Sequence, residues 1–162
     1  MATTPGYGSA YKSVPQQLFT IETDQLGKAI PTSVGSSAYV TFDTAASSAG
    51  SDITDNADGT YSLAAGLDYL VTATATLNNV SWSDATNPPA LILTNTADGS
   101  NIGAAVPATT TLTAVVPASL TPVTIAVTAT APGVSGTWAY PAEIIAATLT
   151  IQVIGGFSRK TK

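Results

Sequence analysis

Apolar and polar residues alternate with a period of two along three stretches of this chain. In residues 69–77 the inner positions are Tyr69, Val71, Ala73, Ala75 and Leu77, opposed by Thr72, Thr74 and Thr76. In residues 123–129 they are Val123, Ile125, Val127 and Ala129, opposed by Thr124 and Thr128. In residues 145–153 they are Ile145, Ala147, Leu149, Ile151 and Val153, opposed by Thr148, Thr150 and Gln152. This period predicts three strands with one face in the core.

Turn residues separate these stretches from shorter strand candidates at 38–43, 60–64, 90–94 and 109–116. The segments 56–59 and 96–99 both end in Asp-Gly, which favours tight reversals with positive φ. No stretch has an apolar period of 3.6, and ten prolines interrupt the chain, so no helix is predicted. The fold class is therefore all-β, a single domain of about seven or eight strands in a sandwich or barrel.

Charge is unevenly distributed. Residues 29–158 contain eight acidic side chains and no basic one, whereas the last four residues include three basic ones. Charged residues make up 9% of the chain, where about 25% is usual. Such a surface fits either an extracellularly exposed β-domain or a domain that packs against copies of itself. The second interpretation is favoured, because homo-oligomeric interfaces are depleted of charge.

The missing residue types exclude most enzyme chemistry. The chain has no His and no Cys, which removes the usual general base, the thiolate nucleophile and the common zinc and copper ligands. A body without Lys or Arg cannot clamp phosphates or neutralise a nucleic-acid backbone. Residues 1–12 lack the apolar region of a secretion signal, and no proline-free apolar stretch is long enough to span a membrane. We expect no enzyme activity, no cofactor or metal, and neither a nucleic-acid nor a membrane partner.

Two acidic features remain as alternatives to that expectation. Asp52, Asp55 and Asp58 precede Gly59 and could offer oxygen ligands to Ca²⁺. Their spacing of three does not match an EF-hand loop, and turn-forming Asp is the favoured interpretation. Glu143 is the only Glu in the body, so a pair of catalytic carboxylates at a fixed separation is not expected.

Aromatic residues mark two loops. Trp82 lies in one, and Trp138 and Tyr140 lie in another. Exposed aromatics beside polar groups can stack on sugars, but aromatics are also enriched at interface cores. We expect these three residues to fill a trimer axis or to cap the ends of the sandwich, with glycan contacts as the alternative.

Residues 1–33 differ in composition from the rest and are predicted to form an N-terminal arm, with one extended segment at 14–21. Residues 34–156 form the predicted domain and 157–162 a basic tail. The aromatic and apolar residues of the arm would be costly in water, so we expect it to lie on a neighbour or on its own domain. The residues predicted to bind a partner are Tyr7, Tyr11, Lys12, Leu18, Phe19, Ile21, Lys28, Arg159, Lys160 and Lys162.

Several short motifs together resemble a known family. The runs at 38–43 (AYVTFD), 52–54 (DIT) and 56–69 (NADGTYSLAAGLDY) are similar to the front half of a C1q/TNF-like jelly roll. The segments 112–117, 123–130 and 147–154, with Leu120 between the first two, are similar to its back half. The sequence departs from the family at Thr121-Pro122, where many members have Gly-Asp.

The resemblance implies a homotrimeric jelly-roll β-sandwich. Domains of this type recur in tailed-phage virions as head decoration, head-fibre and tail-tip proteins. The small, Thr/Ala/Gly-rich, cysteine-free chain looks most like that branch. The resulting expectation is a structural protein on the outer surface of a phage capsid, with the major capsid protein and its own copies as partners. A receptor-binding tail tip is the first alternative, and a secreted C1q/TNF-like ligand is the second.

Overall fold

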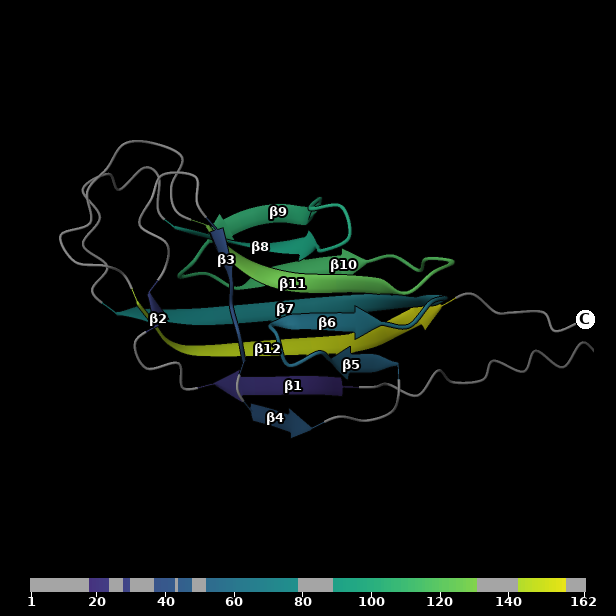
Figure 1. The fold of residues 1–162 in the computed structure, drawn as a ribbon, viewed down its shortest axis with the longest axis horizontal. Helices are drawn as coiled ribbons and strands as arrows, with labels where there is room; N and C mark the ends of the chain where they lie inside the picture. Colours follow the sequence, from purple (N-terminus) through teal and green to yellow (C-terminus); the bar gives the residue numbers. More distant parts are fainter. Residues whose placement is uncertain are drawn as a thin grey trace, which may run out of the picture.

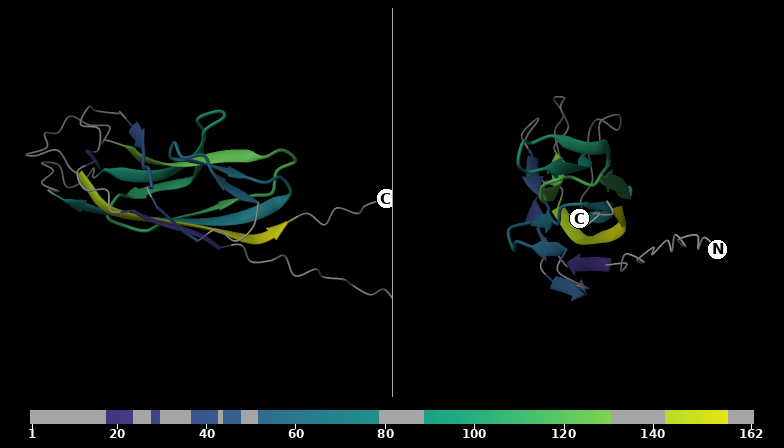
Figure 2. Two further views of the ribbon diagram at one scale, coloured as in Figure 1. Left: turned by 60° about the horizontal axis from the view of Figure 1, so that its bottom comes forward. Right: turned by 90° about the vertical axis from the view of Figure 1, so that its right-hand side faces the viewer.

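A computed structural model describes residues 18–23, 28–29, 37–42, 44–47, 52–78, 89–130 and 143–156. Within these ranges every regular element is a β-strand, and all the strand pairs are antiparallel. The strands form two sheets that pack face to face (Figures 1 and 2). The predicted all-β jelly-roll sandwich is confirmed.

We call the two sheets A and B. Sheet A has the order β10-β7-β12-β1-β4, and β2 also pairs with β12. Its strands are β1 (Leu18–Thr23), β2 (Lys28–Ala29), β4 (Thr44–Ser47), β7 (Leu67–Asn78), β10 (Leu112–Val116) and β12 (Glu143–Gly156). Sheet B has the order β5-β6-β11-β8-β9, and β3 also pairs with β11. Its strands are β3 (Ser37–Tyr39), β5 (Ile53–Asp55), β6 (Thr60–Leu63), β8 (Ala90–Asn95), β9 (Asn101–Pro107) and β11 (Val123–Thr130).

The core lies between the inner faces of the two sheets. Its largest fully buried side chains are Tyr61, Tyr69, Leu63, Leu91, Leu93, Leu112, Ile125, Leu149, Ile151, Val71 and Val127. Most belong to the alternating stretches that the sequence singles out, because period-two alternation places every second residue on the buried face.

A β-bulge corrects one predicted core position. The register between β12 and β7 shifts between Ile144 and Ala146. Ile144 is buried as a result, while Ile145, which the alternation assigns to the core, is only partly covered. The extra residue of a bulge moves its neighbours to the other face, and a simple period of two does not reveal this.

The outer face of sheet B is more covered than predicted. Thr128 of β11 has the outward register, yet it is buried, with its hydroxyl 3.0 Å from that of Thr94 on β8. Hydrogen bonding between the two hydroxyls satisfies polar groups that burial would otherwise penalise. Thr128 is therefore hydrogen-bonded to Thr94 and is not part of the solvent-exposed surface.

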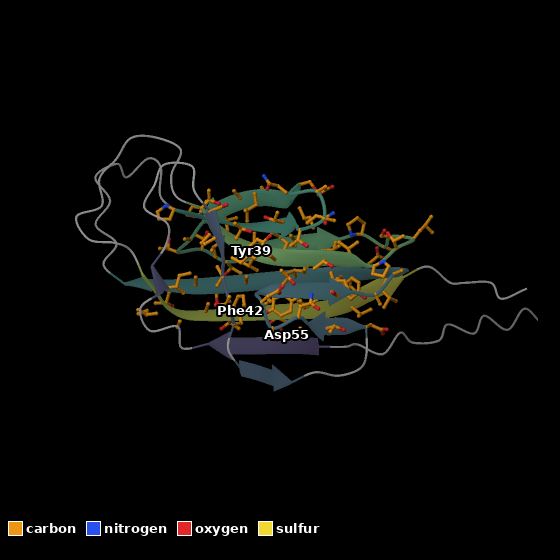
Figure 3. The ribbon with its side chains drawn as sticks, in the orientation of Figure 1. Tyr39, Phe42 and Asp55 are labelled. Atoms are coloured by element: carbon orange, nitrogen blue, oxygen red, sulfur yellow. The ribbon has the colours of Figure 1, made fainter. Side chains whose placement is uncertain are left out.

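Only the first two residues of the predicted strand at 38–43 are in a strand. β3 ends at Tyr39 in sheet B, and the next strand, β4, begins at Thr44 in sheet A. Between them, the Val40 amide donates to the Val127 carbonyl at 2.8 Å. Phe42 also lies in this crossing segment (Figure 3). Its ring meets Tyr61 edge to face, with centroids 6.3 Å apart. These contacts hold the crossing segment against the core.

Among the connections that the structure describes, two join consecutive strands of one sheet as short hairpins. They join β5 to β6 and β8 to β9, and they are the two Asp-Gly turns that the sequence predicts. Gly59 and Gly99 have φ values of 86° and 72°, which glycine adopts without steric cost. Sequence-adjacent strands from β2 onward otherwise lie in different sheets.

The sandwich has two distinct ends. At the first, which we call the terminal end, β1 begins and β12 finishes, with Leu18 paired to Gln152 (right in Figure 1). The turn 64–66 and the segment 117–122 also lie there. At the other, the loop end, β7 finishes and β12 begins, with Asn78 paired to Glu143. The 14 residues of β12 separate the two ends by about 46 Å.

Substitutions in β12 test its register. Ile151 is 0% exposed, so Ile151→Asp buries an unpaired charge and should cost more than about 4 kcal/mol of the free energy of unfolding. Gln152 lies on the outer face, and Gln152→Asp should cost under about 1 kcal/mol in the folded chain. Soluble yield and thermal unfolding of the two variants measure the difference. Equal yields would mean that the register is displaced by one residue.

Candidate functional site

The central part of the outer face of sheet A carries rows of threonines. Thr113 of β10 pairs with Thr72 of β7, Thr72 pairs with Thr150 of β12, and Thr150 pairs with residue 20 of β1, also a threonine. A neighbouring row joins Thr74 to Thr148, which pairs with Glu22 of β1. Asp68 has the outer register nearer the terminal end, because it alternates with the buried Tyr69. The threonines of β7, β10 and β12 thus form a polar region without ions, which can approach another protein at a low desolvation cost.

Apolar side chains continue this face toward the terminal end. Val115 pairs with Leu70, and Leu70 pairs with Gln152. Val115 is 51% exposed and Ile154, two residues beyond Gln152, is 50% exposed. Val115 has the outer register, whereas Ile154 lies at the register shift between Val153 and Gly155.

The acidic residues of the hairpins stabilise turns. Asp58 Oδ1 accepts hydrogen bonds from the Thr60 amide at 2.9 Å and from its hydroxyl at 2.6 Å. Asp98 accepts the same two bonds from Ser100, at 2.9 and 2.7 Å. Asp55 in one turn and Asn95 in the other accept from the amide two residues ahead. The two hairpins thus share one hydrogen-bonding pattern, and the turn interpretation of these Asp residues is confirmed.

The same bonds lower the pKa of Asp58 and Asp98 below its ordinary value of 3.8. The hydroxyl donors of Thr60 and Ser100 have the largest effect, and their amides add to it. Hydrogen bonds to the ionised carboxylate favour that form. Among the described residues no three His, Cys, Asp or Glu side chains are grouped as a metal site would require.

Two buried contacts fix the terminal end. The Tyr69 hydroxyl lies 3.1 Å from the carbonyl oxygens of Asp52 and Ala64, to which it donates. Burial, with a smaller contribution from the negative charge of Asp52, raises the pKa of Tyr69 to about 12. Asp68 Oδ1 accepts the Ala118 amide at 2.7 Å. These bonds join β7 to the neighbouring segments at the terminal end of the core.

Part of the predicted anchoring arm belongs to the sheet. Residues 18–23 form β1, which pairs with β12 on one side and β4 on the other. The register sets Phe19 opposite Ile151 and Ile21 opposite Leu149, two buried residues. Leu18 is opposite Gln152. The extended segment predicted at 14–21 is present from Leu18 onward, on the chain's own sheet. Whether residues 1–33 act as an anchor stays a prediction.

The predicted basic residues fall into two groups by sequence position. Arg159, Lys160 and Lys162 follow Gly156, the last residue of β12, by three, four and six residues, and Lys12 precedes Leu18, the first residue of β1, by six. Both of those strand ends lie at the terminal end. Lys28 pairs with Ile144 at the loop end and is not among them.

The predicted aromatic residues are nearest, in sequence, to strand ends at the loop end. Trp82 follows Asn78 by four residues, and Trp138 and Tyr140 precede Glu143 by five and three. Tyr7, Tyr11, Lys12, Arg159, Lys160 and Lys162, like these three aromatics, lie outside the described residues.

No protein-family model and no curated protein sequence matches this chain. Among solved structures, the globular domain of zebrafish complement 1qA protein is similar, with a TM-score of 0.54 and 14% identity over 88% of this chain and 99% of that one. The fold is a C1q-like jelly roll. The PRD1 vertex protein P5 is also similar, with a TM-score of 0.48 and 15% identity over 85% of this chain and 95% of that one. The described part of the C1q-like sandwich contains no helix able to cross a membrane.

The stability of the C1q-like sandwich should fall in acid partly through its hairpins. Because the pKa of Asp58 and Asp98 is lower in the folded state, their contribution is complete above the ordinary value of 3.8 and is lost as pH falls through the lowered pKa. The melting temperature of the double variant Asp58→Asn, Asp98→Asn should therefore fall less between pH 5 and pH 2 than that of the unmodified chain. An equal fall in both proteins would contradict this assignment.

Proposed function

We propose that this chain is a non-enzymatic structural virion protein that decorates or cements the outer surface of a phage capsid as a homotrimer. The observation that carries the proposal is the uneven distribution of charged and uncharged residues over the sandwich. Four of the five basic residues lie within six residues, in sequence, of the two strand ends that meet at the terminal end, while uncharged threonines occupy the central part of the outer face of sheet A. An anchored end and faces suited to self-association are what a repeated shell component needs.

Attachment is assigned to the terminal end. Outer surfaces of shells tend to be acidic, and residues 159–162 add three positive charges per subunit. Closed symmetry would repeat this group around the trimer axis, so that several weak ion pairs act together. The eight acidic residues of the body would meanwhile keep neighbouring bodies apart and soluble.

Self-association is assigned to the sheet faces. Three neighbouring strands present Thr113, Thr72 and Thr150 at one level of sheet A. Burying threonine hydroxyls against a matching surface costs far less than burying ions. The absence of enzyme activity fits the same picture, because the carboxylates of Asp58, Asp68 and Asp98 accept structural hydrogen bonds.

The alternative function is a trimeric receptor-binding tip or fibre head. The sequence positions of Trp82, Trp138 and Tyr140, nearest to strand ends at the loop end, favour this alternative over a secreted ligand. Aromatic rings presented away from an anchor can stack on a receptor glycan. Anchoring through the terminal end is common to both functions.

Copy number decides between the two functions. Particles carrying this chain would be imaged after labelling with an antibody raised against the purified protein. Hundreds of labelled positions over the head would support decoration, and a few at the tail would support the receptor-binding tip. The absence of label from purified particles would overturn both.

The homotrimer can be tested in solution. Light scattering after size-exclusion chromatography at micromolar concentration should give about three times the chain mass of 16.2 kDa. The double variant Thr72→Glu, Thr150→Glu places two like charges in each copy of the proposed interface and should shift the mass to that of the monomer. Thr54→Glu, at an exposed position of β5 in sheet B, is the matched control and should leave the trimer intact. A chain that is monomeric both in solution and on the particle would refute the assignment.

Attachment to purified shells should depend on salt. Replacing Arg159, Lys160 and Lys162 with Gln removes three exposed charges per subunit, each worth about 0.5 kcal/mol, and should weaken binding roughly tenfold per subunit at low salt. The difference should shrink above physiological ionic strength, where the screening length falls below about 8 Å. Lys28→Gln removes one charge at the loop end and should bind as the unmodified chain does. Binding that responds equally to all four residues would contradict an anchor at the terminal end.

A further inference from the structure

Two turns of the sandwich have the same local sequence and different surroundings. Residues 57–59 and 97–99 both read Ala-Asp-Gly, and a residue with a hydroxyl group follows each of them. Asp58 and Asp98 are both exposed, and each accepts two hydrogen bonds at Oδ1 from the residue two positions ahead. The two turns therefore form a matched pair, in which a difference in reactivity has to come from the fold.

An Asp-Gly pair can form a five-membered ring within its own backbone, because glycine has no Cβ to obstruct the closure. The glycine nitrogen attacks Cγ of the protonated side chain, and the carboxyl hydroxyl leaves with the amide proton as water, which gives a cyclic imide. Hydrogen-bond donors on Oδ1 stabilise the negative charge that develops on that oxygen. Water then opens the ring. Cleavage of the new Cγ–N bond restores aspartate, whereas cleavage of the original peptide bond leaves isoaspartate, in which the main chain runs through Cβ and Cγ.

The fold encloses the first of these pairs. Gly59 is buried, and a Cβ built on it would lie 3.0 Å from Thr41 Cγ2 and 3.4 Å from Tyr39 Cβ. The next residue, Thr60, is 7% exposed. Ring closure has to rotate the peptide plane between Asp58 and Gly59. Close packing against residues 39–41 opposes that rotation.

The second pair is open to solvent. Gly99 is exposed, and no described atom beyond its chain neighbours lies within 4 Å of the position that a Cβ would take. Its amide donates to the Asn95 carbonyl at 2.9 Å, and this bond has to break before the nitrogen can attack Cγ of Asp98. Hydrogen bonds of an exposed turn open locally at a low free-energy cost, because water replaces the lost partner. The turn 96–99 can therefore reach the geometry for ring closure while the sandwich stays folded.

From this contrast we propose that Asp98-Gly99 is a site of spontaneous isomerisation to isoaspartate in the folded chain, and that packing protects Asp58-Gly59. Water is the only other reactant. The inference goes beyond the proposed function and does not depend on it.

The modification changes the outermost strand of sheet B. Isoaspartate lengthens the main chain of the turn by one methylene group. Across this turn the Asn95 amide donates to the Ser100 carbonyl at 2.8 Å, and β9 begins at the next residue, Asn101. β9 pairs with β8 at the edge of the sheet, so it has few other contacts to keep its register. The longer turn should therefore loosen the pairing of β9 with β8 and leave the inner strands unchanged.

The test incubates the folded full-length chain in water enriched in oxygen-18. Each opening of the imide ring places one heavy oxygen at the aspartate position, and peptide mapping by mass spectrometry locates it. The folded chain should carry at least about tenfold more label at residue 98 than at residue 58, since only the exposed turn opens readily. The chain unfolded in urea should carry equal label at both. Equal label in the folded chain, or a preference for residue 98 that persists in urea, would overturn the proposal.

Two variants test the chemistry and the protection separately. Asp98→Glu moves the carboxyl group one methylene further from the attacking nitrogen, and label at residue 98 should fall at least about tenfold because the five-membered ring cannot form. Thr41→Ser removes the methyl group that lies against Gly59 and keeps the hydroxyl, so label at residue 58 should rise about threefold. Circular dichroism checks that both variants are folded. Undiminished label in the first variant would refute ring closure, and unchanged label in the second would refute protection by packing.

Hydrogen exchange tests the effect on the edge strand. The isoaspartate form is separated from the unmodified chain by chromatography, and the two are compared segment by segment. Protection of residues 101–107 should fall in the isoaspartate form, while protection of 123–130 in β11 should stay the same. Equal protection of 101–107 in the two forms would overturn the predicted loosening of β9.

Discussion

The sandwich depends on the burial of two uncharged inner faces against each other. Leu93, Ile125, Leu149 and Ile151 have no measurable exposure, and the described core contains no ionised side chain. Removing apolar surface from water is the dominant favourable contribution to folding. The hydroxyls of Tyr69, Thr94 and Thr128, which lie at the edge of the core, make hydrogen bonds. Because the inner faces are buried against each other, only the outer faces and the two ends are available to bind other molecules.

The ends differ because of how the strands enter and leave the sheets. β1 begins and β12 finishes at one end, whereas β7 finishes and β12 begins at the other. In sequence, Lys12 and Arg159 are nearest to the first pair of strand ends, and Trp82 and Tyr140 are nearest to the second. Strand length sets the distance between the two ends.

Much of the fold could be predicted from sequence, and the omissions have physical causes. Period-two alternation identified β7, β11 and β12, and the Asp-Gly pairs identified both hairpins, since each signal is local. The bulge at Ile144–Ala146 and the crossing at Val40–Phe42 depend on pairing with distant strands and leave no local pattern. The sheet position of residues 18–23 was missed for the same reason. Of the candidate surfaces, the threonine rows on the outer face of sheet A followed from the alternation. The exposure of Leu120 could not be predicted, because exposure depends on which distant segments lie against a residue.

The position of β12 has a consequence for biosynthesis. β12 lies between β7 and β1, so β1 and β4 join sheet A only through a strand that is translated more than a hundred residues after β1. Until residue 156 has left the ribosome, the first strands have no partner across their inner edge, whereas the β5–β6 and β8–β9 hairpins can already close. Such non-local pairing slows folding. The nascent chain therefore exposes strand edges for most of its synthesis, and exposed edges can pair with those of neighbouring chains.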